Sequence, residues 1–290
     1  MDYLYHIIIM IGIYSILALS ANIPTGLANL LSLAQAAFYG IGAYLSAFIL
    51  LYHNIPILPA LLFITLITGT LSLLVSLASI RFKGDYFVIA TMGFQLIVFA
   101  VLYNWTSVTR GSYGVTGIPS PKLLGAIEIS SNLQFAIFTI FLTAFIALLF
   151  YLVSISAYGR VLKAIRSDEL SVSVSGRNVN GFKISSFFIS AAFSAIAGFI
   201  FAAYVKYIDP TSFTLDESIF ILSAIFIGGL GNVKGSIAGA AFIVLLPELL
   251  RFAGLPDSIA ANLRQIIYGL SLILLMRYYP KGLAGDVMLK

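Results

Sequence analysis

The chain has 290 residues, of which 60% are apolar and 9% are charged. Soluble domains carry about 25% charged residues, so this composition excludes a soluble enzyme, a nucleic-acid-binding domain and a disordered chain. The formal net charge of +5 is interpreted as a set of topology signals, since basic residues in membrane proteins mark the cytoplasmic loops. The chain has no cysteine, which excludes disulfides and thiolate metal sites.

Long segments without Asp, Glu, Lys or Arg predict membrane-spanning helices, and the longest covers residues 3–80. A helix needs about 20 apolar residues to cross a bilayer. We therefore predict one transmembrane domain, residues 1–290, that is all-α and polytopic, with about eight to nine transmembrane helices that include broken or re-entrant segments. The predicted spans cover residues 6–22, 36–52, 56–80, 85–105, 133–155, 184–205, 218–250 (a pair broken near 228–235) and 265–279.

Two features of the first 35 residues qualify this pattern. Asp2 is the only charged residue before the first apolar run, so the basic region of a secretory signal is missing and a retained span is favoured. Residues 26–35 are too short to cross the bilayer and follow Pro24 and Gly26. They predict a broken or re-entrant half-helix.

Basic residues orient the predicted spans. Alternating spans place Arg81 and Lys83, the loop at about 156–183, Lys234 and the tail at 277–290 on the same side of the membrane. The positive-inside rule makes this side cytoplasmic. The first loops carry no charge, so they do not indicate on which side the N-terminus lies.

The loop at about 156–183 is the longest basic loop of the chain. Ser167 can cap a helix, Asp168 and Glu169 suit its first turn, and Gly176 suits a left-handed terminator. This pattern predicts a helix of about eight residues, roughly 12 Å long, outside the bilayer. A solvated connector whose charges only set topology is an equally good interpretation of these residues alone.

This loop resembles the ATPase-contacting loop of bacterial ABC importer permeases, specifically the LivM-type subunit of branched-chain amino acid transporters. The matching positions are Gly159, Arg160, Ala164, Ile165, Arg166, Asp168, Glu169, Gly176 and Asn178. The family usually has paired alanines after the glutamate, where this chain has Ser171 and Val172 after Leu170. Further segments resemble family signatures in the same order: residues 32–44, 81–87, 111–119, 228–232 and 280–283.

The resemblance implies a permease subunit that translocates branched-chain amino acids by alternating access across a bacterial or archaeal cytoplasmic membrane. It implies as partners a LivH-like second permease, two cytoplasmic ATPases, and a periplasmic or lipoprotein substrate-binding protein. ATP would be used by those ATPases, so this non-catalytic chain is expected to bind no cofactor, metal or nucleic acid. Consistently, the sequence has no Gly-x-x-x-x-Gly-Lys-Ser/Thr motif, and its two histidines are too few for a three-His zinc site.

A polar amino acid must still find partners inside the membrane. Broken helices at 24–26 and 228–231 would expose backbone groups to its charged ends. The side chains that could line a weakly polar path are Asn29, Ser32, Gln35, Thr91, Gln95 and Thr116. Hydrogen bonding between helices is the alternative role for each of them. Gly231, Gly235 and Gly239 recur every four residues, which predicts close helix packing.

Other functions remain open on the sequence alone. Within the same class, the substrate could be urea, a short amide or a nucleoside. An autonomous secondary carrier is the alternative from a different class, although such carriers commonly place ionisable groups within their spans. Here Glu248, beside Pro247, is the main ionisable residue near a helix, and an outer-edge carboxylate near Arg251 is its favoured interpretation. A membrane-embedded enzyme is disfavoured because no reactive cluster is visible.

Overall fold

Six helices in the described part of the chain are long and apolar enough to cross a membrane. The computed structural model describes residues 2–53, 55–79, 81–82, 84–123 and 127–252, together with residues 263, 266, 267, 269, 270, 277 and 282. The six are α1 (Asp2–Asn22, continued by the π-helical turn η1, Ile23–Leu27), α2 (Gln35–Tyr52), α3 (Ile57–Ser79), α4 (Asp85–Asn104), α6 (Asn132–Ile155) and α9 (Val179–Val205). The prediction of an all-α membrane protein is confirmed.

The predicted broken pair corresponds to α10 (Leu215–Gly228) and α11 (Val233–Phe252), which pack against each other. The last predicted span, at 265–279, lies outside the continuously described residues, as does the basic tail apart from Arg277. A total of eight to nine transmembrane helices therefore stays a prediction.

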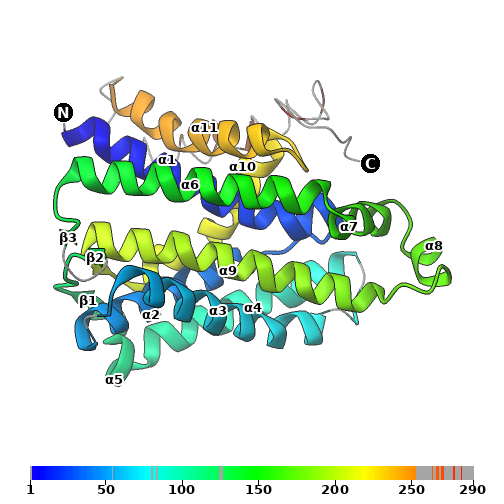
Figure 1. Ribbon diagram of the computed structural model, residues 1–290, viewed down its shortest axis with the longest axis horizontal. Helices are drawn as coiled ribbons and strands as arrows, with labels where there is room; N and C mark the ends of the chain where they lie inside the picture. The colour runs from blue at the N-terminus through cyan, green and yellow to red at the C-terminus, as the bar shows by residue number, and fades with distance from the viewer. Residues whose placement is uncertain are drawn as a thin grey trace.

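Short elements mark the two ends of the bundle (Figure 1). One end carries α7 (Ala157–Ser167) and α8 (Glu169–Val174). The other end carries the remaining short elements, which are α5 (Thr106–Thr109), η2 (Gly111–Tyr113), β1 (Val115–Thr116), β2 (Lys122–Leu123), β3 (Ile127–Glu128), β4 (Tyr207–Ile208) and η3 (Pro210–Phe213). Strand β1 pairs antiparallel with β4, and β2 pairs antiparallel with β3. A 3.4 Å salt bridge joins Lys122 of β2 to Glu128 of β3.

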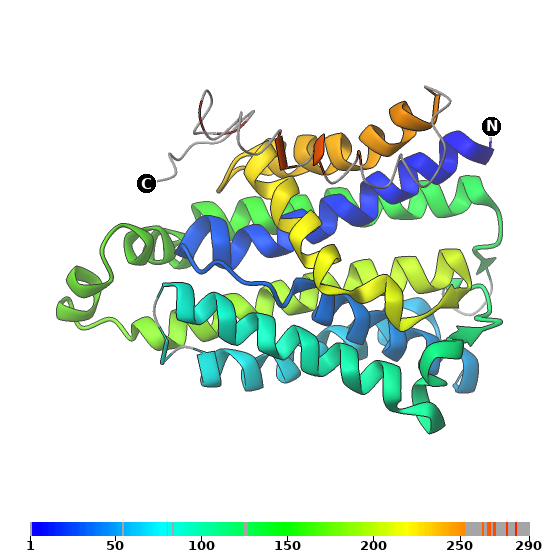
Figure 2. The same cartoon turned by 180° about the vertical axis from the view of Figure 1, so that it is seen from behind.

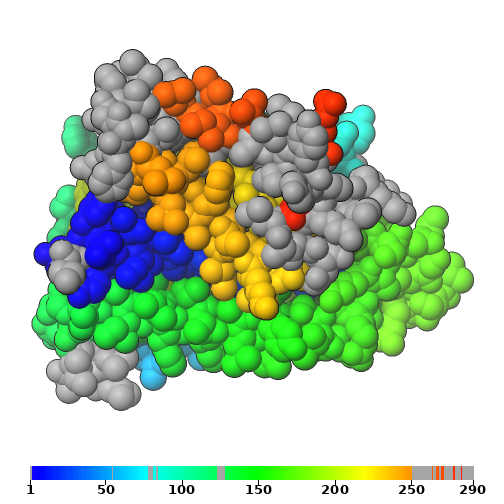
Figure 3. All heavy atoms as spheres, turned by 90° about the horizontal axis from the view of Figure 1, so that it is seen from above, coloured from blue at the N-terminus to red at the C-terminus, as the bar shows by residue number. Residues whose placement is uncertain are grey.

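Helices α1, α2 and α9 form the centre of the bundle. α1 lies between α6 and α11 (Figure 3). A Cβ atom at Gly42 would lie 2.5 Å from the Ala195 Cα, and one at Gly198 would lie 2.5 Å from the Tyr39 carbonyl oxygen. The backbones of α2 and α9 therefore approach closely, because small residues occupy their contact, as is common between helices in membranes.

Large apolar side chains cover the outside of α3, α4 and α6. Phe63, Ile97 and Phe141 are 59%, 62% and 66% exposed, respectively. A soluble monomer rarely leaves so much contiguous apolar surface in water. These faces therefore suit contact with lipid or with another transmembrane subunit.

The predicted half-helix at 26–35 is wrong. The first helix continues past Pro24 in π-helical form to Leu27, and the chain then runs irregularly to α2, which begins inside the bundle at Gln35 (Figure 2). Proline lacks an N–H and crowds the preceding turn, so the helix changes register here rather than stopping. Asn29 has φ 56° and turns the chain back. The irregular backbone is acceptable within the membrane because protein surrounds much of it.

The structure groups the charges by end. The α3–α4 connection, which carries Arg81, the α7–α8 region and the start of α11, which carries Lys234, lie toward the same end of the bundle, called here the basic end (Figure 1). Helix α1 starts at the opposite end (Figure 1). The N-terminal end of α1 therefore lies on the side opposite α7 and α8, which the uncharged first loops could not indicate.

Candidate functional site

Helix α7 is an amphipathic helix beyond the membrane-spanning part of α6. Ser156 separates the two helices and caps α7, since its Oγ accepts a 3.2 Å hydrogen bond from the Gly159 N–H. Leu162 and Ile165 are buried, whereas Arg160 is exposed. α7 therefore packs one apolar face on the bundle and presents a basic face outward.

Asp168, and not Ser167, caps α8, so the predicted cap is wrong. The Asp168 Oδ1 accepts hydrogen bonds from the Leu170 N–H at 2.9 Å and the Ser171 N–H at 3.3 Å. Ser167 instead ends α7, where its hydroxyl donates to the Lys163 carbonyl at 3.2 Å. The Ser171 hydroxyl also donates to the Asp168 carboxylate, and these bonds hold the pKa of Asp168 below its usual value.

The predicted helix of about eight residues corresponds to the six-residue α8, and it is preceded by a second helix, α7, that was not predicted from the sequence. The extended backbone of Asp168, with φ −156°, interrupts helical hydrogen bonding between them. After α8, Gly176 takes a left-handed φ of 78°, as expected for a helix terminator. Asn178 then caps α9, since its Oδ1 accepts a 3.1 Å hydrogen bond from the Gly181 N–H.

An ion pair with one buried partner attaches α8 to the bundle. The Lys183 Nζ lies 2.8 Å from the Glu169 Oε2, and the Lys183 side chain is 8% exposed, whereas the Glu169 side chain is 38% exposed. Val172 of α8 is also buried. Removing Glu169 would leave the buried Lys183 charge uncompensated, so this contact links α8 to the first turns of α9.

Arg166 joins α7 to the first transmembrane helix. Its Nη1 donates a hydrogen bond to the carbonyl oxygen of Gly26 in η1. The last carbonyls of a helix lack N–H partners within that helix, so the guanidinium supplies one. Partial burial lowers the pKa of Arg166, but a guanidinium stays charged in proteins. The bond is therefore charge-assisted.

The two predicted helix breaks meet in space. The Asn22 Nδ2 donates to the Ser236 hydroxyl at 2.7 Å, and its Oδ1 accepts from the Gly231 N–H at 2.9 Å. A Cβ atom at Gly26 would lie 2.8 Å from the Gly231 nitrogen and would collide with Asn22. We call this region the junction: Asn22, η1, the 229–232 connection and Arg166.

Asn22 was not among the residues singled out from the sequence. An amide at the end of a charge-free span, two residues before a proline, is the signal that could have identified it. Gly282 belongs to the same neighbourhood, since a Cβ atom there would lie 2.7 Å from the Gly229 Cα. The late segment 280–283 therefore reaches the α10–α11 connection through its described residue.

A cavity of about 670 Å³ opens beside the junction. Its lining includes Asn29, Asp85, Arg166, Glu169 and Lys183, together with apolar residues of the 28–31 segment and of α4. The cavity separates part of the irregular segment after η1 from the start of α4. Arg166, at the wall of this cavity, forms a direct polar link between α7 and the interrupted first helix.

Two of the predicted path residues, Ser32 and Gln35, lie just before and at the start of α2. The Gln35 Nε2 donates to the Ser190 hydroxyl at 2.8 Å, and its Oε1 accepts from the Ser194 hydroxyl at 2.9 Å. Ser32 is buried and its Oγ accepts from the Ala34 N–H at 3.2 Å. The hydrogen-bonding capacity of these side chains is thus used in part within the protein.

Thr91 and Gln95 of α4 complete the same polar region. The Thr91 Oγ1 accepts from the Leu33 N–H at 3.1 Å, and the Gln95 Nε2 donates to the Phe213 carbonyl at 2.8 Å. Asn29 instead lines the cavity near the junction, and Thr116 is exposed in β1 at the opposite end. The structure therefore does not bring all six together, and their part in translocation stays a prediction.

The glycine series lies against the chain's own α10. A Cβ atom at Gly239 would lie 1.9 Å from the Ala224 carbonyl oxygen, and one at Gly235 would lie 2.6 Å from the Gly228 carbonyl oxygen. Gly231 precedes α11 and has φ 77°. Gly235 and Gly239 therefore let two backbones touch, whereas Gly231 serves the turn between them.

Comparison with known proteins identifies the family of this chain. Residues 3–276 match the model of a family described as the permease component of the branched-chain amino acid transport system. The chain belongs to this family. No solved structure matches the chain significantly.

Curated relatives of this permease family member cover nearly the whole chain. It is 32% identical to the high-affinity branched-chain amino acid transport system permease protein LivM of Salmonella typhimurium, over 94% of this chain and 68% of the relative. A probable LivM permease of Methanocaldococcus jannaschii is 24% identical over 98% of this chain and 94% of the relative. The LivH permease of Escherichia coli is 24% identical over 94% of this chain and 91% of the relative. These relatives are transport permeases, and this chain is a multi-pass membrane protein.

Proposed function

We propose that this chain is a permease subunit of an ABC importer that carries branched-chain amino acids across a bacterial or archaeal cytoplasmic membrane. The names of its relatives support the substrate class. The observation that carries the proposal is the α7–α8 segment, which extends beyond the bundle and is linked to the interrupted first helix by Arg166. Such a segment suits contact with a cytoplasmic motor.

The junction supplies a route for coupling. A displaced α7 would move Arg166 and the Gly26 carbonyl, and Asn22 would pass this movement to the α10–α11 connection. A hydrogen bond to a charged group contributes about 1.5–3 kcal/mol. This magnitude suits a coupling contact, because coupling free energies between sites are typically about 1–3 kcal/mol. Rocking of helices around the junction would open the path to one side at a time.

The proposed assembly distributes the remaining tasks over partner chains. A second, LivH-like permease completes the path, and a periplasmic or lipoprotein substrate-binding protein delivers the amino acid. Two cytoplasmic ATPases bind the α7–α8 segment and use ATP, while this chain binds no cofactor and catalyses no reaction. The similarity to a LivH permease as well as to LivM permeases supports pairing of two related permease subunits.

Deletion of residues 168–175 tests the coupling role. We expect the variant, reconstituted with its partners in proteoliposomes, to lose ATP-driven leucine uptake while it still inserts in the membrane and pairs with the second permease. A matched variant, Lys122→Gln in the hairpin at the opposite end, should transport normally. Normal uptake by the deletion variant would reject the proposed role of α8.

Competition separates the possible substrates. Excess leucine, isoleucine or valine should block the uptake of labelled leucine, whereas urea, short amides and nucleosides should not. Labelled leucine uptake driven by an ion gradient without the ATPases would instead indicate a secondary carrier.

A further inference from the structure

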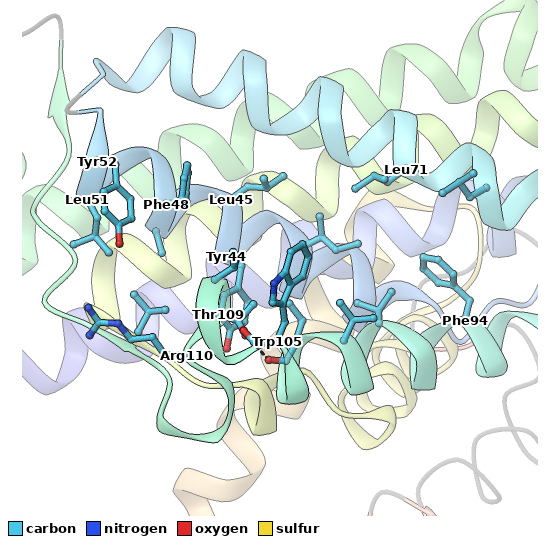
Figure 4. Close-up of a pocket in the computed structure, with 18 residues that line it drawn as sticks. Tyr44, Leu45, Phe48, Leu51, Tyr52, Leu71, Phe94, Trp105, Thr109 and Arg110 are labelled. Atoms are coloured by element: carbon cyan, nitrogen blue, oxygen red, sulfur yellow. Dashed lines mark hydrogen bonds between the residues drawn. The ribbon is translucent and has the colours of Figure 1, made fainter.

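An apolar groove of about 520 Å³ lies on the outer face of the bundle, between α2, α3 and α4 (Figure 4). Leu45 and Phe48 form part of its α2 wall, Leu71 and Leu74 its α3 wall, and Phe94 its inner limit on α4. This face covers none of the polar residues of the junction. Because the chain spans a membrane, the groove opens toward lipid or toward another transmembrane chain.

The length of the groove favours lipid. On α4 it extends from Phe94 to Trp105, which is about 16 Å at 1.5 Å per residue. One leaflet contributes half of a hydrocarbon core about 30 Å thick, or about 15 Å. A partner helix would be about 10–12 Å wide and would continue along α4 across both leaflets. On α3 the lining continues to Leu74 but does not reach the end of that helix at Ser79. A groove that stops short of the basic end suits a chain that enters from the opposite leaflet.

The mouth of the groove carries a positive charge. Arg110 lines it at the end where Tyr52 and Leu51 also lie, opposite Phe94 (Figure 4). Arg110 is exposed, has φ 59°, and forms no salt bridge within the described part of the chain. The Thr109 hydroxyl fixes the preceding turn by donating to the Leu102 and Trp105 carbonyls, each at 2.7 Å. An arginine beside tyrosine and tryptophan at a membrane edge is well placed for a phosphate.

An unpaired polar group lies in the wall of the groove. The Tyr44 side chain is 9% exposed, and its hydroxyl has no hydrogen-bond partner among the described residues. Burying a hydroxyl without a partner is costly, and buried tyrosine hydroxyls usually find one. The carboxylate of Asp209, on a neighbouring element, already accepts from Thr211 and from Ser212. A ligand that displaces the side chains covering this hydroxyl would offer Tyr44 an acceptor.

We propose that the groove is a binding site for a glycerophospholipid from the leaflet opposite α7 and α8. One acyl chain occupies the space between α2, α3 and α4, the phosphate contacts Arg110, and an ester carbonyl accepts from Tyr44. All three parts of such a lipid meet a matching feature of the groove: apolar walls that stop short of the basic end, a cation at the mouth, and an unsatisfied donor in the wall between them. The site rests on the chain's membrane-spanning fold and not on the proposed transport activity.

Photolabelling tests the site. Membranes containing the full transporter are supplied with a phosphatidylglycerol that carries a photoactivatable group on one acyl chain, and labelled peptides are mapped by mass spectrometry. We expect labels on the groove walls of α2 and α4. Leu74→Trp should fill the groove and reduce this labelling at least fivefold. Leu148→Trp on α6, at a similar depth and similarly exposed, should leave it unchanged.

Three variants examine the polar contacts. Tyr44→Phe and Arg110→Gln should each lower the amount of phospholipid that remains bound after detergent purification, severalfold, while Arg110→Lys should retain more than Arg110→Gln. Equal labelling of the groove walls in the wild type and in Leu74→Trp would overturn the proposal. A disulfide between Phe48→Cys and a cysteine in the second permease would also overturn it, because the groove would then hold a helix. The chain's lack of native cysteine makes this crosslink unambiguous.

Discussion

Arg166 is the residue on which the proposed coupling depends most directly. Its guanidinium reaches from α7 to the Gly26 carbonyl, and this geometry requires both the length of arginine and its fixed donor arrangement. Lysine is not equivalent at such a site, because its ammonium is a compact, strongly hydrated point charge.

Arg166→Gln should therefore uncouple the transporter. The loss of a charge-assisted bond of about 1.5–3 kcal/mol corresponds to roughly a 10- to 100-fold change in an equilibrium. We expect leucine uptake per ATP hydrolysed to fall by at least tenfold, while ATP hydrolysis by the partner subunits continues. Arg166→Lys should lie between wild type and Arg166→Gln.

Arg177→Gln provides the control for loss of charge alone, since Arg177 is an exposed basic residue in the same region. Coupled uptake at wild-type levels in Arg166→Gln would show that the bond to Gly26 carries no coupling.

The Asp168 cap predicts a pH dependence of α8. Its pKa is lowered by hydrogen bonds from the Ser171 hydroxyl, the Ser171 N–H and the Leu170 N–H. A carboxylate with a depressed pKa stabilises the folded form above its unfolded pKa of about 3.9, and this contribution is lost as the pH falls through the lower folded value. Hydrogen exchange at the Leu170 and Ser171 amides should therefore show constant protection from about pH 5 upward and loss of protection below.

Capping variants separate this effect from general acid unfolding. Asp168→Asn should keep most of the protection and remove its pH dependence, because asparagine caps helices about as well as aspartate. Asp168→Ala should lose the protection at every pH. Similar exchange in wild type and Asp168→Ala at neutral pH would contradict the cap.

At the scale of elements, backbone contact between α10 and α11 depends on glycine. A side chain at Gly239 would collide with the Ala224 carbonyl of the neighbouring helix. Overpacking of this kind costs about 1–3 kcal/mol, and the opposing atom here is backbone, which cannot change rotamer.

Gly239→Val should consequently lower the thermal midpoint of the purified transporter in detergent and reduce its amount in the membrane. Gly93→Ala is the matched control in α4, where a new Cβ would meet nothing within 4 Å. Its midpoint should be unchanged or slightly raised. Equal midpoints for Gly239→Val and wild type would mean that α10 and α11 can separate at no cost.

At the scale of the whole molecule, the chain presents two different ends to the two sides of the membrane. Helices α7 and α8 lie at the basic end, while α5, the short strands and the start of α1 lie at the other (Figure 1). The positive-inside rule assigns the basic end to the cytoplasm.

Single cysteines can report this sidedness, because the native chain has none. Ser173 in α8 and Ser112 in η2 are both exposed. A membrane-impermeant maleimide should label Ser112→Cys in intact cells but label Ser173→Cys only after the membrane is opened. The reverse pattern would invert the proposed orientation and remove α8 from contact with cytoplasmic ATPases.

Much of this architecture follows from local chemistry along the chain. Long charge-free segments define most of the transmembrane helices, since burying charge in lipid is costly whatever the neighbouring helices are. Gly176 is recognisable as a helix terminator for a similarly local reason, the left-handed backbone that glycine tolerates. The cap of α8 was misplaced by one residue, because Ser167 and Asp168 are both good caps and packing of α7 decides between them.

The junction, in contrast, depends on contacts between residues far apart in the chain. Asn22 reaches Gly231, and Arg166 reaches Gly26, and no local pattern specifies such pairs. The course of the chain through 26–35 also depends on its surroundings, because its irregular backbone is stable in a membrane only where other helices enclose it. Composition and periodicity therefore account for a helical membrane protein with a basic loop, whereas the link from that loop to the interrupted helix arises from packing in three dimensions.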